Sequence, residues 1–222
     1  MYLAIDTCTE TAGLALFDGQ RVVAEYVWLA GRNHTVQTAP ALDWLLRTHG
    51  LAPTDLTGLV VAKGPGGFNG IRVGMALAKG LALTLNIPVV GVSTLETHAY
   101  PFIWAGHPVW GLIEMGRGQV AAAGYESADG WPRRTVAERL VTPQEVCAEI
   151  TGPTVFCGTL KPETVETITA SLGNRALMPA APLPARSPAA LAVLGYRRLA
   201  TGDHDDPAGL APLYLRMSSV GE

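Results

Sequence analysis

Hydrophobic positions in the first fifty residues change from the spacing of strands to the spacing of a helix. Three apolar runs predict strands at 2–5, 12–17 and 21–29. Asp18-Gly19, between the second and third runs, is typical of a tight hairpin turn. Apolar residues at helical intervals then predict a helix over 34–48, which Gly50 ends. Pro40 lies inside that helix, so we expect a kink or an irregular first turn.

The pattern then alternates between strands and helices. An apolar strand at 58–62 is followed by a glycine-rich turn, a helix to about Leu85 and a strand at 89–92. The predicted order is therefore β-β-β-α-β-α-β, and the later strands, which a helix connects, are expected to be parallel. Three antiparallel strands at the start do not fit a Rossmann fold.

The second half of the chain predicts shorter elements. We expect a helix at 96–103, a hairpin of strands at 109–115 and 119–126, a polar loop at 127–139, a helix starting at 142–145, a strand at 154–157, a proline-rich connector at 179–188, a helix at 189–200 and an extended tail at 213–216.

The glycine-rich turn spans 64–74 and lies between a predicted strand and a predicted helix. Such a turn leaves backbone N–H groups open at a helix N-terminus, where a phosphate can bind. The dinucleotide pattern G-x-G-x-x-G would require glycine where Asn69 stands, and the P-loop requires Lys and Ser/Thr where Ile71-Arg72 stand. The turn therefore has the backbone of a phosphate site without the usual side chains.

The same segment places small residues along one ridge of the predicted helix. They recur every four residues, at Gly66, Gly70, Gly74, Ala78 and Ala82. A ridge of this kind lets another element approach closely, and each helical glycine costs about 1 kcal/mol relative to alanine. The ridge can pack against the sheet or a helix of the chain itself, or against a partner, and the sequence leaves both alternatives open.

Composition excludes several classes of protein. Of 222 residues, 48% are hydrophobic and 16% charged, which indicates a globular protein with room for an exposed apolar patch. The net charge of −3 makes autonomous nucleic-acid binding unfavourable. Cys8, Cys147 and Cys157 have no CxxC spacing, so neither a disulfide framework nor a zinc site is indicated. With no basic leader and no membrane-length apolar run, we expect a soluble cytoplasmic protein.

Candidate catalytic residues do not form a coherent set. Asp6, Thr7 and Thr9 follow the first strand and would suit a Mg²⁺-bound water near a nucleotide, or would simply cap their own turn. His34, His98 and His107 are not spaced as metal ligands, and no serine lies in a G-x-S-x-G setting. We therefore expect no catalytic residues and no metal site.

Four segments together resemble the TsaB (YeaZ) family. They are the opening Leu3–Glu10, His34 at the start of the first helix, the G-P-G-x-F-x-G-x-R-x-G run at 64–74 and the tail Pro212-Leu213-Tyr214-Leu215-Arg216. The resemblance implies a two-lobed α/β fold of the actin, Hsp70 and sugar-kinase (ASKHA) type with a reduced second lobe. We expect the lobes at 1–101 and 102–222, with the helix near 189–200 able to pack on the first.

The resemblance also implies a function. TsaB proteins are non-catalytic partners of TsaD in making N6-threonylcarbamoyladenosine at position 37 of tRNAs that read ANN codons. We therefore expect a scaffold subunit that binds TsaD as a heterodimer and TsaE in a larger complex, with tRNA contacted only indirectly, no membrane, and a homodimer possible in isolation. No cofactor is expected in the isolated chain, and a nucleotide only in the complex.

We expect the partner surface on the helices at 34–48 and 68–85. Its predicted residues are His34, Leu42, Leu45, Gly66, Phe68, Gly70, Arg72, Gly74 and Ala78. This prediction rests on the small-residue ridge and on the amphipathic first helix.

The chain departs from the family patterns at several positions. Where TsaD has its N-H-x-x-x-H metal stretch, this chain has Thr94 and keeps only His98, and one imidazole does not make a two-histidine site. The family's D-A-R-R-G-E-V-Y stretch corresponds to 114–121, where Arg117 and Gly118 remain, and Gly67 and Asn69 replace the usual Ser and Thr. Two alternatives stay open: a metallopeptidase-like or kinase-like enzyme of the same fold, and a stand-alone small-molecule-binding domain.

Overall fold

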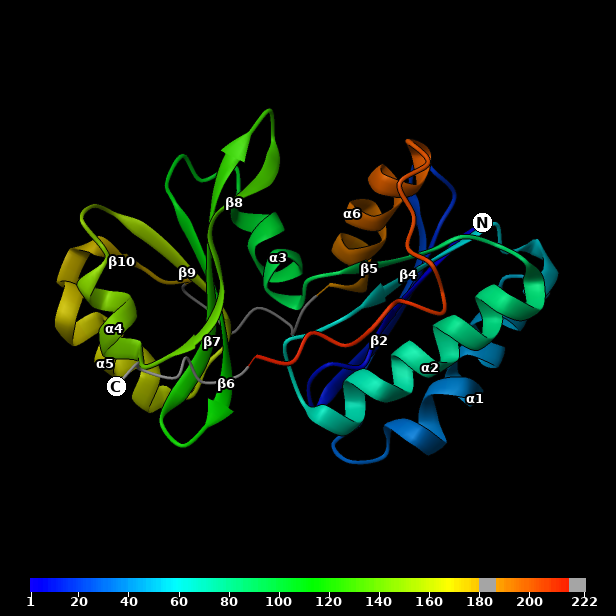
Figure 1. Cartoon of the computed structure of the whole chain (residues 1–222), viewed down its shortest axis with the longest axis horizontal. Coiled ribbons are helices and arrows are strands. Elements are labelled where there is room, and N and C mark those ends of the chain that lie inside the picture. Colours follow the sequence, from blue (N-terminus) through cyan, green and yellow to red (C-terminus); the bar gives the residue numbers. More distant parts are fainter. Residues whose placement is uncertain (180–186, 216–222) are drawn as a thin grey trace. The chain divides into compact units, whose positions relative to one another are not determined.

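The computed structural model describes residues 1–179 and 187–215, which form two compact units (Figure 1). The first unit consists of Met1–Thr94 and Ser187–Leu213, and the second of Leu95–Arg186 and Tyr214–Glu222. The first unit ends earlier than residue 101 because Leu95, Ala99 and Ile103 belong to the core of the second. Residues 180–186 of the predicted proline-rich connector, and Arg216 of the tail motif, lie outside the described residues.

The first unit is built on a mixed sheet with the strand order β3-β2-β1-β4-β5. The strands are β1 Tyr2–Asp6, β2 Thr11–Phe17, β3 Val22–Leu29, β4 Gly58–Ala62 and β5 Val89–Val92. The first three are antiparallel neighbours, whereas β4 pairs parallel with both β1 and β5. This is the predicted order, and the buried β4 and β5 require cover on both faces of the sheet.

Helices supply that cover. Helices α1 (His34–Thr48) and α2 (Phe68–Leu85) lie on one face, and α6 (Pro188–Ala200) lies on the other (Figure 1). Alternate residues of the strands point to opposite faces, so Leu3 and Ile5 pack in the core with α1 and α2. Pro40 does not interrupt α1, which is continuous through it.

The packing of α6 depends on glycine at the contact with the sheet. A Cβ placed on Gly195 would overlap the side chain of Val60, and one on Gly13 would overlap Pro188. The predicted return of this helix to the first lobe is therefore a close helix-on-sheet contact.

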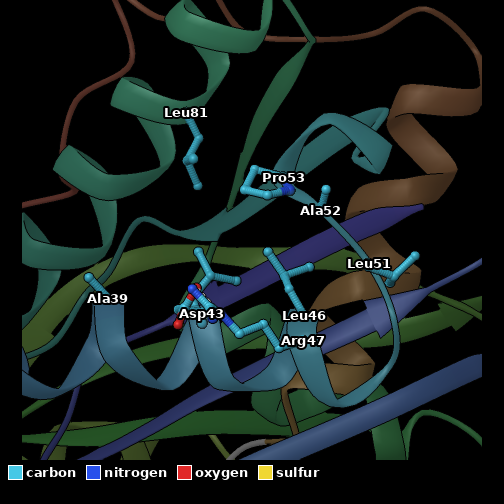
Figure 2. Close-up of a pocket in the computed structure, with 9 residues that line it drawn as sticks. Ala39, Asp43, Leu46, Arg47, Leu51, Ala52, Pro53 and Leu81 are labelled. Carbon is cyan, nitrogen blue, oxygen red and sulfur yellow. Dashed lines mark hydrogen bonds and ion pairs between the residues drawn. The ribbon is translucent and has the colours of Figure 1, made fainter.

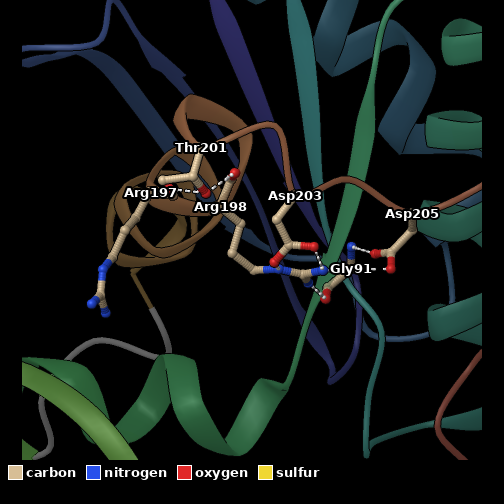
Figure 3. Close-up of polar contacts among 6 residues, drawn as sticks. All are labelled: Gly91, Arg197, Arg198, Thr201, Asp203 and Asp205. Atoms are coloured by element: carbon tan, nitrogen blue, oxygen red, sulfur yellow. Dashed lines mark hydrogen bonds and ion pairs between the residues drawn. The ribbon is translucent and has the colours of Figure 1, made fainter.

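The last turn of α6 and the segment that follows it protect the edge of β5 (Figure 3). Arg198 donates to the Gly91 carbonyl at 3.0 Å, while the Asp205 carboxylate accepts from the Gly91 N–H at 2.7 Å. Arg198 also forms ion pairs with Asp203 and Asp205. Further along, the Lys79 ammonium donates to the Leu210 carbonyl at 3.0 Å, which ties this segment to α2.

The second unit contains another sheet, with the order β10-β9-β6-β7-β8. Its strands are β6 Val109–Gly116, β7 Gln119–Ala128, β8 Trp131–Val141, β9 Thr154–Thr159 and β10 Ala176–Leu177. Its helices are α3 Thr94–Ala99, α4 Pro143–Ala148 and α5 Pro162–Leu172, and short 3₁₀ turns occupy Tyr100–Phe102 and Gly173–Arg175. The first unit has one such turn, at Pro53–Asp55. One cluster of core residues packs with α3, and a second includes residues of α4 and α5.

One prediction for this unit was wrong, and one helix was not predicted. The segment expected as a polar loop at 127–139 contains the edge strand β8, in which Arg133 and Arg134 form ion pairs with Glu126 and Glu138. An edge strand with charged residues does not show a clear alternation of apolar and polar positions. Helix α5 was also not expected, because its threonine-rich sequence gives only a weak helical signal.

Two glycine-to-alanine substitutions should have opposite effects on stability. Gly195→Ala should destabilise the chain by about 1–3 kcal/mol, because the added methyl group overlaps Val60. Gly80→Ala is the matched control: Gly80 lies in α2 with no atom near its Cβ position, so alanine should stabilise by up to about 1 kcal/mol. Denaturant unfolding measures both, and equal effects would contradict the close contact.

Candidate functional site

The glycine run lies directly against the turn between β1 and β2. The two segments follow neighbouring parallel strands, and the Gly67 N–H donates to the Cys8 carbonyl at 2.7 Å. A Cβ on Gly66 would overlap that carbonyl, and a Cβ on Gly70 would overlap the Thr7 carbonyl. Glycine is therefore required at both positions for backbone to pack on backbone.

The Thr7 hydroxyl bonds into the first turns of α2. It donates to the Gly70 carbonyl at 2.7 Å and accepts from the Gly74 N–H at 3.0 Å, so it joins two groups that are usually paired with each other in a helix. A Cβ on Gly74 would lie 2.5 Å from this hydroxyl oxygen. The buried Thr7 side chain thus explains why the ridge continues through Gly74.

His34 ties the start of α1 to the same turn. Its Nε2 lies 2.7 Å from the Thr9 carbonyl oxygen, and since that oxygen only accepts, Nε2 must be protonated. The Thr38 hydroxyl donates to the His34 carbonyl, and the Ala30 N–H donates to the Glu10 carbonyl at 2.8 Å. The turn is consequently held by α2 on one side and by the start of α1 on the other.

The predicted nucleotide-cleft residues bond with the turn itself or with α2. Asp6 is buried, and its carboxylate accepts from the Cys8 N–H at 2.9 Å. The Thr9 hydroxyl bonds with Thr11, and the Thr7 hydroxyl bonds with α2. The contacts of Asp6 and Thr9 favour the alternative in which these side chains cap their own turn, whereas Thr7 joins the turn to α2. Nucleotide binding stays a prediction.

The structure places most of the predicted partner-surface residues inside the chain. Gly66 is half-buried. Most of the others are buried within the chain: His34, Leu42, Leu45, Gly70, Gly74 and Ala78. The ridge therefore packs against the chain's own turn and core, which was the alternative left open. Phe68 and Arg72 are exposed, with the guanidinium 3.7 Å from the ring centroid.

Other apolar side chains of α1 and α2 are exposed instead. Val36 and Trp44 on α1 are 68% and 53% exposed, and Leu83 on α2 is 67% exposed. Val36 lies at helical spacing from the other apolar residues of α1, but the buried face of this helix follows Thr38, Leu42 and Leu45. The sequence could have indicated these exposed residues only through their spacing, because they do not fall at the helical intervals of the buried residues.

A pocket of about 330 Å³ lies beside these helices (Figure 2). It is lined by Ala39, Leu42, Asp43, Leu46, Arg47, Leu51, Ala52, Pro53 and Leu81. Most of the lining is apolar, and the ion pair between Asp43 and Arg47 is exposed. The pocket suits an apolar side chain better than a charged ligand.

The structure also describes the two positions that correspond to the TsaD metal stretch. Thr94 and His98 are both buried, at the start and near the end of α3. Within residues 1–179 and 187–215, no group of three or more His, Cys, Asp or Glu side chains is arranged to hold a metal ion.

No helix in the described part of the chain is both long and apolar enough to cross a bilayer.

Comparisons with known proteins identify the family. Residues 28–156 match the family model of TsaD, the tRNA N6-adenosine threonylcarbamoyltransferase. The tRNA threonylcarbamoyladenosine biosynthesis protein TsaB of Bacillus subtilis is 36% identical over 98% of this chain and 95% of its own length. The chain belongs to the TsaB family. The family predicted from the four sequence segments is therefore confirmed.

Solved structures agree with the TsaB assignment. YeaZ from Pseudomonas aeruginosa superimposes with a TM-score of 0.82 at 26% identity, over 96% of this chain and 99% of that one. Component A of the Acidaminococcus fermentans (R)-2-hydroxyglutaryl-CoA dehydratase is 14% identical with a TM-score of 0.52, over 90% of this chain and 98% of that one, and shows the fold alone. The ASKHA-type fold predicted for this TsaB-family chain is confirmed.

Loss of the Thr7 hydroxyl should weaken the contact between the turn and α2. Thr7→Val should destabilise the chain by about 1–3 kcal/mol, because the buried Gly70 carbonyl and Gly74 N–H lose their partner. Thr7→Ser is the control, since it keeps the hydroxyl and should retain most of the stability. Thermal unfolding compares the two, and a Thr7→Val chain as stable as the wild type would contradict the role of this hydroxyl.

Proposed function

We propose that this chain is the non-catalytic, TsaD-binding subunit of the machinery that forms N6-threonylcarbamoyladenosine at position 37 of tRNAs that read ANN codons. Similarity to a TsaB protein over nearly the whole of both chains supports this function. The match of residues 28–156 to the TsaD model supports a partner that is itself a relative of this chain. The work of such a subunit is to bind and support TsaD in the cytoplasm.

The chemistry of the candidate site supports the absence of catalysis. The Thr7 and Thr9 hydroxyls are engaged by backbone groups of the chain, and the Asp6 carboxylate accepts from the backbone. Thr94 stands where TsaD has the first histidine of its metal stretch, which leaves only His98. A metal-assisted transfer needs more ligands than this pair supplies.

The observation on which the partner surface rests is the exposure of large apolar side chains on two neighbouring helices. Val36, Trp44, Phe68 and Leu83 are each more than half exposed and lie on α1 or α2. Exposed apolar side chains gathered on adjacent elements are typical of protein interfaces. We therefore place the TsaD contact on the outer faces of α1 and α2, where a specific interface would bury about 1,600 Å² in total.

Other partners follow from the same surface. A second copy of the chain would cover these apolar side chains when TsaD is absent, so the isolated chain would form a homodimer that TsaD displaces. TsaE would join only the assembled complex. The net charge of −3 argues that tRNA is contacted mainly through the other subunits.

A charge on the outer face of α2 should disrupt TsaD binding. Leu83→Glu should weaken the affinity for TsaD about tenfold or more, because a carboxylate would be buried in an apolar contact. The side chain is exposed in the free chain, so its thermal stability should change little. Isothermal titration with TsaD from the same organism measures the affinity.

Leu29→Glu is the matched control for this experiment. Leu29 is 76% exposed at the end of β3 and belongs to neither helix, so the same change of residue should leave the affinity unchanged. Undiminished TsaD binding by Leu83→Glu, or an equal loss in both variants, would contradict the proposed surface.

The isolated chain should bind ATP weakly or not at all. Backbone N–H groups and a helix dipole contribute about 0.3–1 kcal/mol to an exposed anion, whereas micromolar binding requires about 8 kcal/mol. Asp6 and Glu10 add negative charge at the turn. Calorimetric titration with ATP and Mg²⁺ should therefore show no low-micromolar binding, and such binding without partners would contradict a site that other subunits complete.

A further inference from the structure

The hairpin of β6 and β7 turns through two residues in the left-handed conformation. Gly116 pairs with Gln119 across the turn, and Arg117 and Gly118 between them have φ values of 54° and 72°. Positive φ at both central residues defines a type I′ turn, which favours Asn, Asp or Gly at its first position. Arginine at this position is unfavourable for the turn.

The other described positions with positive φ are occupied by residue types that tolerate this conformation. In the described ranges, the other non-glycine residues with positive φ are Asn86 and Asp129, whose short polar side chains tolerate this conformation. Asp129-Gly130 forms the matching two-residue turn between β7 and β8. A strained residue that is kept against the local preference indicates a role beyond the turn itself.

The charge of Arg117 is also exceptional within the second unit. Every other arginine of that unit that the structure describes is engaged by the chain. They are Arg133 with Glu126, Arg134 with Glu138, Arg139 with Glu149, and Arg175 with the Ile150 carbonyl. Arg117 is exposed at the tip of the hairpin, and no hydrogen bond or ion pair joins it to any residue in 1–179 or 187–215.

We propose that Arg117 binds a carboxylate on a protein partner of this chain. A guanidinium presents two parallel N–H groups that match both oxygens of a carboxylate, and the two-residue turn places this side chain at the tip of the hairpin. A protein is favoured over RNA because one unpaired guanidinium, in a unit whose other described arginines are already engaged, does not make a basic surface. The inference rests on the proposed function, which makes TsaD that partner.

The decisive substitution is Arg117→Asn, because it separates the turn from the contact. Asparagine suits a type I′ turn, so the thermal midpoint should rise by about 2–4 °C. The affinity for TsaD should nevertheless fall about tenfold or more, since a charged hydrogen-bonding partner is lost. Titration of the full-length chain with TsaD of the same organism measures the affinity, and calorimetric unfolding measures the stability.

Two further variants act as controls. Arg117→Lys keeps the charge but not the paired N–H groups, so its affinity should lie between those of the wild type and Arg117→Asn. Arg133→Gln removes the same charge from the exposed strand β8, where Arg133 is paired with Glu126, and should leave the affinity within about twofold.

The outcomes separate this inference from the proposed function. An Arg117→Asn chain that is more stable and binds TsaD as tightly as the wild type would overturn the inference alone. Unchanged TsaD affinity with weaker retention of tRNA by the assembled complex would overturn it in favour of an RNA phosphate contact. A wild-type chain that does not bind TsaD at all would overturn both proposals.

Discussion

Close packing of backbone on backbone between the glycine run and the first strand turn is the constraint on which the first unit depends. No side chain fits between Gly66 and the Cys8 carbonyl or between Gly70 and the Thr7 carbonyl. Because the run begins α2 and the turn follows β1, this contact sets where α2 lies on the sheet. His34 then fixes the start of α1 against the same turn. The outer faces of both helices are positioned by contacts buried beneath them.

Much of the first unit could be predicted from the sequence because its elements have strong local signals. The strands of the mixed sheet are short and apolar, and α1 and α2 have a clear helical period. Strand β8 could not be predicted in the same way, since its charged side chains are satisfied by ion pairs across the hairpin rather than by burial. The Asp129-Gly130 turn was the local signal that remained, and it fits the hairpin that the structure shows.

At the candidate site, the sequence indicated that the glycine run is packed closely, but not which part of the chain it contacts. Recurring glycines indicate a close approach, yet the sequence alone does not say which surface approaches, because the Thr7 hydroxyl and the Cys8 carbonyl come from a segment distant in the chain. Helical spacing likewise cannot separate a core position such as Leu45 from an outer one such as Val36 when a helix packs against both a sheet and another helix. That choice is made by tertiary packing.

The side-chain contacts at β5 have a consequence for how the protein behaves at high concentration. An edge strand with open N–H and C=O groups can pair with a strand of another molecule, which is a common route to aggregation. At Gly91 both groups are already bonded, one to Arg198 and the other to Asp205. This side of the sheet is thereby closed to growth at Gly91, so folded chains at high concentration are protected there against joining edge to edge.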